Sequence, residues 1–231
     1  MKIKHGMILA AGLGKRMHPI TFKTPKPLIQ IGNKNLLERA IELLINHGVE
    51  EIAINVHHLA DQIKDFINER KYKAKIIITD EKHALLDTGG GILNATKSFK
   101  EPFVVVNPDT LWSGAYSNEL KNLENLYYKQ KKSCLLLVNK KLSFDNSFKG
   151  DFNLCDNTIS RDISNEFIFT GLQILDKSVF NSMTVKIFSM NKIWDYLIKN
   201  DYLYGVESEL KFYHLNTKEM YEKISNLRII D

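Results

Sequence analysis

The sequence predicts an α/β protein whose mixed, mostly parallel sheet is covered by helices on both faces. Three observations carry this prediction. Short apolar runs alternate with segments of helical periodicity in the first half of the chain. The apolar runs are continuous rather than alternating, which is typical of strands buried on both faces. Glycine, asparagine or proline stands at the ends of these segments, where a turn is needed.

The first half of the chain supplies the parallel core. Strands are expected at residues 7–10, 52–56, 76–78, 103–106 and 135–138, and helices at residues 36–45, 60–67, 92–99 and 120–127. Gly48 is expected to end the first of these helices. Pro19, Pro25 and Pro27 predict extended backbone between the first strand and the first helix.

The second half is less regular. Residues 148–154, 167–175, 203–206 and 210–215 are expected to form strands, and residues 193–198 and 220–227 helices. No internal repeat or linker interrupts the chain. We therefore expect one domain over residues 1–231, in which a core of residues 1–140 carries a smaller lobe and a closing helix formed by residues 141–231.

Composition narrows the classes of function. The net charge of +5 is small for a nucleic-acid binder, and aromatic residues are not interleaved with the basic ones, so we expect no nucleic-acid partner. No stretch approaches the roughly 20 apolar residues of a membrane span, and the apolar run at residues 7–11 is too short for a signal peptide. Cys134 and Cys155 match no metal or redox spacing. A cytoplasmic protein without a membrane partner is the default expectation.

The charge distribution points to an anion site near the N-terminus. Residues 1–37 contain no acidic residue, although seven basic residues lie in the same stretch: Lys2, Lys4, Lys15, Arg16, Lys23, Lys26 and Lys34. They surround the loop at Gly12 and Gly14, where glycines leave room for backbone N–H groups to approach phosphate. This loop, the loop at Gly89 and Asp109 each follow a predicted strand, so we expect them to meet at one edge of the sheet.

The Gly12 loop is neither a Walker loop, because Lys-Ser/Thr is missing, nor a dinucleotide fingerprint, because Met17 replaces the third glycine. Residues 9–17, followed by residues 24–28 with Lys26 between two prolines, instead resemble the signature of the sugar-phosphate nucleotidylyltransferases. Residues 86–92 are similar to that family's base-recognition segment, and residues 107–109 to its metal-binding turn. Residues 148–152 and 169–171 resemble its sugar-side strands.

The resemblance implies the Rossmann-like nucleotide-diphospho-sugar transferase fold, with a small sugar-side lobe. It also implies the reaction in which a nucleoside triphosphate and a sugar 1-phosphate give a nucleotide sugar and pyrophosphate. Arg16 and Lys26 would be the catalytic cations, on the leaving phosphates and the α-phosphate. Nucleotide would contact Leu9, Ala10, Ala11, Gly12, Gly14, Lys15, Thr88 and Gly89, and sugar phosphate would contact Asn107, Asp151, Gly171 and Lys186.

Metal binding is where the chain departs from the family pattern. Asp109 would hold Mg²⁺, although an aspartate after a strand can also serve as a turn or cap residue. The family's second metal-binding aspartate stands in a Trp-x-Asp-x-Gly-Thr-like segment, where this chain has His214 and, in the glycine position, Asn216. Three readings stay open. His214 binds a metal such as Mn²⁺, Glu207 or Glu209 reaches the site instead, or metal binding is weakened.

The substrates also stay open at this level. The subgroup that uses UTP and N-acetylmuramate 1-phosphate resembles the chain most. GTP with mannose or heptose 1-phosphate comes next, and CTP with a phosphocholine-like acceptor is a further option. A nucleotide-binding protein with impaired catalysis would also explain His214 and Asn216. The oligomeric state is not predicted.

Overall fold

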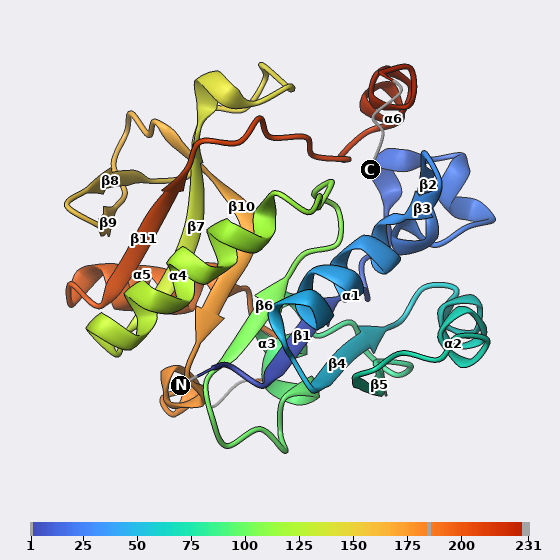
Figure 1. The fold of residues 1–231 in the computed structure, drawn as a ribbon, viewed down its shortest axis with the longest axis horizontal. Coiled ribbons are helices and arrows are strands. Elements are labelled where there is room, and N and C mark those ends of the chain that lie inside the picture. Colours follow the sequence, from blue (N-terminus) through green and yellow to red (C-terminus); the bar gives the residue numbers. More distant parts are fainter. Residues whose placement is uncertain (1, 184–185, 228–231) are drawn as a thin grey trace.

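A computed structural model describes residues 2–183 and 186–227 of the chain. In this described part a nine-stranded sheet has the order β5-β4-β1-β6-β10-β7-β11-β9-β8 (Figure 1). Its strands are β1 His5–Leu9, β4 Glu51–Val56, β5 Lys75–Asp80, β6 Phe103–Val106, β7 Ser133–Asn139, β8 Asn153–Cys155, β9 Thr158–Ser160, β10 Phe167–Leu175 and β11 Leu203–Ser208. Parallel pairs join β1, β4, β5 and β6, whereas β10 runs antiparallel between β6 and β7. The predicted fold class is confirmed.

Helices cover both faces of the sheet (Figure 1). The helices are α1 Leu36–His47, α2 Ala60–Asn68, α3 Asp87–Ala95, α4 Tyr116–Gln130, α5 Met190–Lys199 and α6 Lys218–Ser225. One apolar core lies under α1, α2 and α4, and the other under α3 and α5. Strand β6 shows why the apolar runs are continuous, since Val104 and Val106 enter the first core while Phe103 and Val105 enter the second.

Strand β1 is the point at which the strand order reverses. The chain leaves β1 for β4 on one side and later reaches β6 on the other, and all three strands are parallel. In sheets of this type the loops after neighbouring strands diverge at such a point and leave a crevice beyond the carboxyl ends. The loops after β1, β4, β5 and β6 therefore all open toward one edge.

The stretch between β1 and α1 differs from the prediction. Instead of extended backbone it forms three short 3-10 turns, Lys15–Met17, Ile20–Phe22 and Lys26–Leu28, followed by the small hairpin of β2 Gln30–Ile31 and β3 Lys34–Asn35. The prediction was wrong because the φ angle of proline also suits the start of a helical turn. Met17, in the first of these turns, belongs to one buried apolar cluster with Ile29, Ile31 and the α6 residue Ile224.

Three other boundaries also differ. Helix α3 already begins at Asp87, so the three glycines lie inside it, and it ends before Phe99. Of residues 148–154 only Asn153–Cys155 form a strand, and its partner β9 was not predicted. Residues 210–215 make isolated bridges, from Phe212 to Ser143 and from His214 to Thr110, rather than a strand. None of the described helices has both the length and the apolar content to cross a bilayer.

Candidate active site at the carboxyl edge of the sheet

A cavity of about 360 Å³ lies at the carboxyl ends of β1, β4, β5 and β6. Eleven of the residues predicted from the sequence line it: Leu9, Ala10, Ala11, Gly12, Gly14, Lys15, Arg16, Lys26, Thr88, Asn107 and Asp109. Its wall thus combines the Gly12 loop, basic side chains and the turn after β6. The predicted meeting of strand-end loops is what the structure shows.

The Gly12 loop contains two glycines, Gly12 and Gly14, whose surroundings differ. Gly14 has a φ of 61°, and a Cβ there would lie 2.9 Å from the Thr21 methyl group. Thr21 Oγ1 donates to the Gly14 carbonyl at 2.9 Å and holds the turn. No described atom lies within 4 Å of a Cβ built on Gly12, which lines the cavity. The space beside Gly12 is therefore open to a ligand.

Lys26 and Asp109 form an ion pair in the cavity wall, with Lys26 Nζ 2.7 Å from Asp109 Oδ2. Their side chains are only 15% and 24% exposed. Burial raises the pKa of the Asp109 carboxyl. Lys26 and then His214 lower it by a larger amount together, so the pKa lies well below its ordinary value. Asp109 is therefore a carboxylate at neutral pH. Lys15 and Arg16 are exposed, and no carboxylate among the described residues pairs with either.

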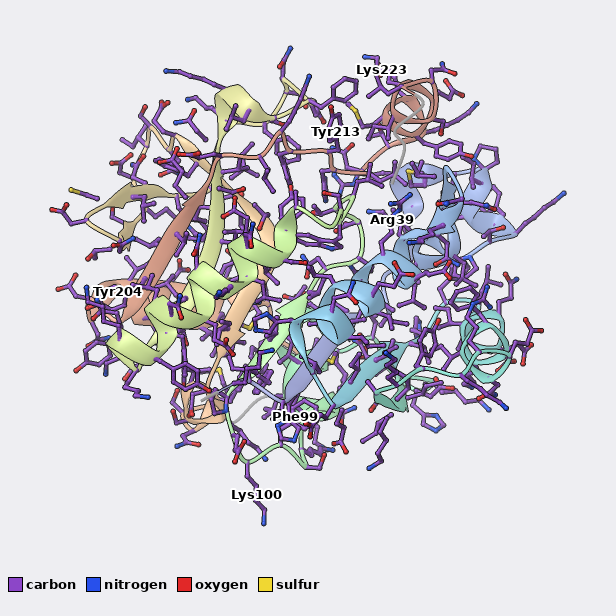
Figure 2. All side chains as sticks on the ribbon, in the orientation of Figure 1. Arg39, Phe99, Lys100, Tyr204, Tyr213 and Lys223 are labelled. Carbon is purple, nitrogen blue, oxygen red and sulfur yellow. The ribbon has the colours of Figure 1, made fainter. Side chains whose placement is uncertain are left out.

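His214 approaches the same carboxylate from outside the cavity. Its Nε2 lies 3.2 Å from Asp109 Oδ2, and its ring stacks on Phe212 and meets Phe148 edge-on. It does not line the cavity, whereas Asn216, two residues later, does. Both lie on the segment that leads past Tyr213 toward α6 (Figure 2). Glu207 and Glu209, the alternative acids considered from the sequence, are exposed and also lie outside the cavity lining.

A buried polar bridge under the cavity was missed by the sequence analysis. Asn55 Oδ1 accepts from Ala10 N at 2.9 Å, and Asn55 Nδ2 donates to Glu81 Oε1 at 2.7 Å. Glu81 Oε2 in turn accepts from Leu86 N at 2.9 Å. The bridge fixes three cavity loops relative to one another. A polar residue near the end of the apolar run 52–56 is the signal that could have revealed it.

Leu85, Asp87 and Asn216 also line the cavity without having been predicted as site residues. Leu85 is an exposed apolar side chain in the cavity wall. Asp87 has a φ of 61°, a strained conformation for a residue other than glycine, and its Oδ1 accepts from Thr88 N. No sequence pattern marks such a conformation.

Besides His214, four predicted site residues lie away from the cavity lining: Gly89, Asp151, Gly171 and Lys186. Gly89 N donates to the Phe188 carbonyl, so it is not free to bind a nucleotide. Asp151 Oδ2 accepts from Phe169 N, and Lys186 is exposed. Gly171 supports the site from behind, because its carbonyl accepts from Asn107 N and its lack of a Cβ admits the Asn107 side chain.

The donor atoms in the wall suit a hard divalent cation. Asp109 Oδ1, Asn107 Oδ1 and Asn216 Oδ1 are buried and have no hydrogen-bond partner among the described residues, and all three side chains line the cavity. In the part of the chain that is described, no three or more His, Cys, Asp or Glu side chains are grouped so that they could hold a metal ion by themselves. Mg²⁺ commonly uses one or two carboxylates and keeps waters and substrate phosphates as its other ligands, so these oxygens fit it.

The site thus brings cations, the glycine-containing loop at Gly12 and the partly buried Asp109 carboxylate to one concave surface. Such a surface can hold a polyphosphate and stabilise charge on it, because donors fixed in advance need no reorganisation. In contrast, none of the described residues that line the cavity is a Ser, Cys or His that could act as a nucleophile or a base. The arrangement favours chemistry by positioning and electrostatics.

Comparison with known proteins agrees with this geometry. N-acetylmuramate alpha-1-phosphate uridylyltransferase of Neisseria meningitidis serogroup B is 32% identical over 182 residues, 77% of each chain. The protein of that name from Caulobacter vibrioides is 39% identical over 113 residues, 47% of each chain. The chain spans about half the length of several curated relatives that it matches.

A crystal structure of UDP-glucose pyrophosphorylase complexed with UDP-glucose has a TM-score of 0.81 at 23% identity, covering 97% of this chain and 98% of that one. The two structures therefore share their fold over nearly the whole chain. The profile of the family described as Nucleotidyl transferase matches residues 5–142, which include the Gly12 loop, Lys26 and Asp109. This chain therefore belongs to the nucleotidyl transferase family.

Proposed function

We propose that the protein transfers a nucleotidyl group from a nucleoside triphosphate to a sugar 1-phosphate and releases pyrophosphate. One observation carries the proposal. Lys26 and the Asp109 carboxylate lie 2.7 Å apart in a cavity that also contains the Gly12 loop and the exposed Arg16. A reaction between two polyanions needs cations and a metal-binding carboxylate on one surface.

The residues divide the work by position. Backbone N–H groups of the Gly12 loop and the side chains of Lys15 and Arg16 hold the β- and γ-phosphates, which leave together. Lys26 stabilises the charge that develops on the α-phosphate oxygens as the sugar phosphate oxygen attacks in line. Asp109, with Asn107 and Asn216 in the same wall, would hold Mg²⁺ or Mn²⁺. When bound, the metal neutralises phosphate charge and aligns the reacting oxygens.

For the substrates we propose UTP and N-acetylmuramate 1-phosphate. The names of two relatives, at 39% and 32% identity, support this pair. Leu85 offers the base an apolar contact at the mouth of the cavity. Sugar selection is assigned to the chain's second part, residues 141–231. Asp151, Gly171 and Lys186 would reach sugar phosphate there only if the lobe moves toward the cavity, because none of them lines it.

The test is pyrophosphate release with each of the four ribonucleoside triphosphates and dTTP. Each is paired with N-acetylmuramate, N-acetylglucosamine, glucose or mannose 1-phosphate, or with phosphocholine, in Mg²⁺ and in Mn²⁺. The proposal expects release with a sugar 1-phosphate, fastest with UTP and N-acetylmuramate 1-phosphate. Lys26→Gln serves as the negative control.

Fastest release with GTP and mannose 1-phosphate, or with CTP and phosphocholine, would overturn the substrate pair but keep the reaction. Nucleotide binding without pyrophosphate from any pair in either metal would overturn the reaction itself. That second outcome would mark a nucleotide-binding protein with impaired catalysis.

A further inference from the structure

We propose that Asn216, rather than His214, supplies the metal ligand from the segment before α6, and that His214 is a positioning residue for Asp109. This inference rests on the proposed function, because it concerns the metal of that site. It assigns separate roles to the two residues by which this chain departs from the family's pattern of an aspartate and a glycine. The contacts of each residue carry one half of the argument.

The Nε2 atom of His214, which could otherwise bind a metal, points at the Asp109 carboxylate. A carboxylate only accepts hydrogen bonds, so His214 Nε2, 3.2 Å from Asp109 Oδ2, contributes a proton there. A nitrogen that carries a proton has no lone pair for a metal. The other nitrogen, Nδ1, is buried and has no hydrogen-bond partner among the described residues, but His214 does not line the cavity.

The ring of His214 is also held in place from both sides. Phe212 stacks on it with an interplanar angle of 13°, and Phe148 meets it at 64°. The backbone is tied to the turn after β6, since His214 bridges Thr110 and Leu215 N donates to the Asp109 carbonyl at 2.7 Å. With Lys26 on the same Oδ2 atom, His214 fixes the rotation of the Asp109 carboxylate and leaves Oδ1 unpartnered among the described residues.

Asn216 has the opposite arrangement. Its Nδ2 donates to Asp145 Oδ2 at 3.0 Å, and Asp145 Oδ1 is held by the backbone N and the hydroxyl group of Ser147. Because Asp145 can only accept, the amide orientation of Asn216 is fixed with its oxygen directed away from Asp145. That oxygen is buried and has no partner in the described residues, and the side chain, 8% exposed, lines the same cavity as Asp109.

The chemistry of the two donors agrees with this division. Mg²⁺ prefers oxygen ligands, and amide oxygens are among those it accepts, whereas imidazole suits softer metals. Asn216 lines the cavity and His214 does not. An amide oxygen at position 216 can therefore take the place of a carboxylate at position 214, with one unit of negative charge less. We expect weaker metal binding than a two-carboxylate site would give, but the same hard-ligand preference.

The decisive experiment measures the ligands of the bound metal. The full chain is loaded with Mn²⁺ and inorganic tripolyphosphate, which contains no nitrogen, and electron spin echo envelope modulation is recorded. We expect no coupling to a directly bound imidazole nitrogen, and a spectrum unchanged in His214→Gln. Imidazole coupling that is lost in His214→Gln would overturn the inference.

Affinity for Mn²⁺, from the free-ion signal in the same titration, tests the two roles separately. Asn216→Ala should weaken binding about tenfold or more, and Asn226→Ala, an exposed control on the same C-terminal segment, should not change it. His214→Phe keeps the stacked ring but loses the donor, and it should weaken binding by about 10–100-fold. His214→Gln keeps a donor and should recover most of that loss.

Normal affinity in Asn216→Ala would overturn the ligand assignment, and normal affinity in His214→Phe the positioning role. Thermal unfolding of each variant shows that it is folded, and a variant that is not folded is replaced by Asn216→Ser or His214→Asn. Because these readouts do not use turnover, a protein that binds Mn²⁺ as expected but releases no pyrophosphate would contradict the proposed function and leave this inference standing.

Discussion

At the scale of single residues, the two carboxylate oxygens of Asp109 have different surroundings. Lys26 and His214 both approach Oδ2, whereas Oδ1 is buried without a partner among the described residues. The charge on Asp109 is stabilised by its neighbours, so its pKa lies below the ordinary range despite burial. The carboxylate is thus kept charged and oriented before any ligand arrives.

Lys26→Gln should lower the rate of pyrophosphate release by about 10²–10³-fold, as the removal of other preorganised charge-stabilising groups does. The side chain keeps its approximate length and polarity, so the loss reports the missing charge. Steady-state kinetics with saturating triphosphate measures it, and Lys23→Gln, an exposed lysine in the same segment, is the matched control. Activity within about threefold of the parent would show that Lys26 has no catalytic role.

At the scale of elements, the Asn55–Glu81 bridge connects β1, β4 and the segment before α3. Its hydrogen bonds form a directed chain, from Ala10 N to Asn55 Oδ1 and from Asn55 Nδ2 to Glu81 Oε1. Each orientation depends on the next. The bridge is therefore sensitive to a change of a single donor or acceptor.

In Glu81→Gln, one of the two donors that meet Glu81, Asn55 Nδ2 or Leu86 N, would face an NH₂ group. If Asn55 rotated to accept, it would lose Ala10 N. We expect a loss of about 1–3 kcal/mol in the free energy of unfolding and a higher KM for the triphosphate, because cavity loops lose their support. Denaturant unfolding and kinetics measure the two effects.

The control for Glu81→Gln is Glu50→Gln, which changes an exposed ion pair with Lys4 and should cost at most about 1 kcal/mol. Equal stability of the Glu81 and Glu50 variants would show that the bridge is not needed to hold the loops together.

The glycines of α3 make a second interface between elements. A Cβ on Gly90 would lie 2.2 Å from the Lys186 carbonyl oxygen, and one on Gly89 would lie 2.4 Å from the Phe188 ring. Both N–H groups donate to the Phe188 carbonyl. These glycines therefore allow the segment before α5 to pack closely on the start of α3. This explains why glycine, a poor helix former, occupies these helical positions.

Gly90→Ala should destabilise the protein by about 1–3 kcal/mol, because backbone rather than a flexible side chain must move. Gly114→Ala is the matched control, since no described atom lies within 4 Å of its Cβ and its φ is not in the left-handed region. Thermal unfolding of both variants measures the difference. Equal midpoints would mean that the two segments separate at little cost.

At the scale of the whole molecule, one sheet connects both parts of the chain. Strand β10, from the second part, lies between β6 and β7 of the first. Cys134 lies in β7, fully buried at the centre of this sheet, and burial raises the pKa of its thiol to about 12. Cys155 in β8 is exposed at the sheet's edge.

A thiol reagent at pH 8 should therefore modify one cysteine per native chain quickly and the second only at the rate of global unfolding. The raised pKa keeps the Cys134 thiol protonated at pH 9, so raising the pH from 8 to 9 should not speed the slow phase through its ionisation. Absorbance of the released thiolate measures both phases. Cys155→Ser should abolish the fast phase alone. Rapid reaction of two thiols in the native protein would show that the sheet opens locally.

The sequence by itself determined the main strands and helices of the first half and indicated an anion site there. Continuous apolar runs identified the buried strands, and the order of Gly12, Lys26 and Asp109 indicated a phosphate site, because local periodicity and turn residues act over short distances. It did not determine which side chains meet. The contacts of Lys26 and His214 with Asp109, of Asn55 with Glu81, and of Asn216 with Asp145 join residues 26 to 105 positions apart.

These contacts depend on the strand order and on the path of the segment after β11, and no local pattern specifies either of them. The same holds for Gly89 and Gly90 of α3, which leave room for Phe188 and Lys186. Only the tertiary structure could therefore show that His214 lies behind Asp109 and that Asn216 lies in the cavity wall.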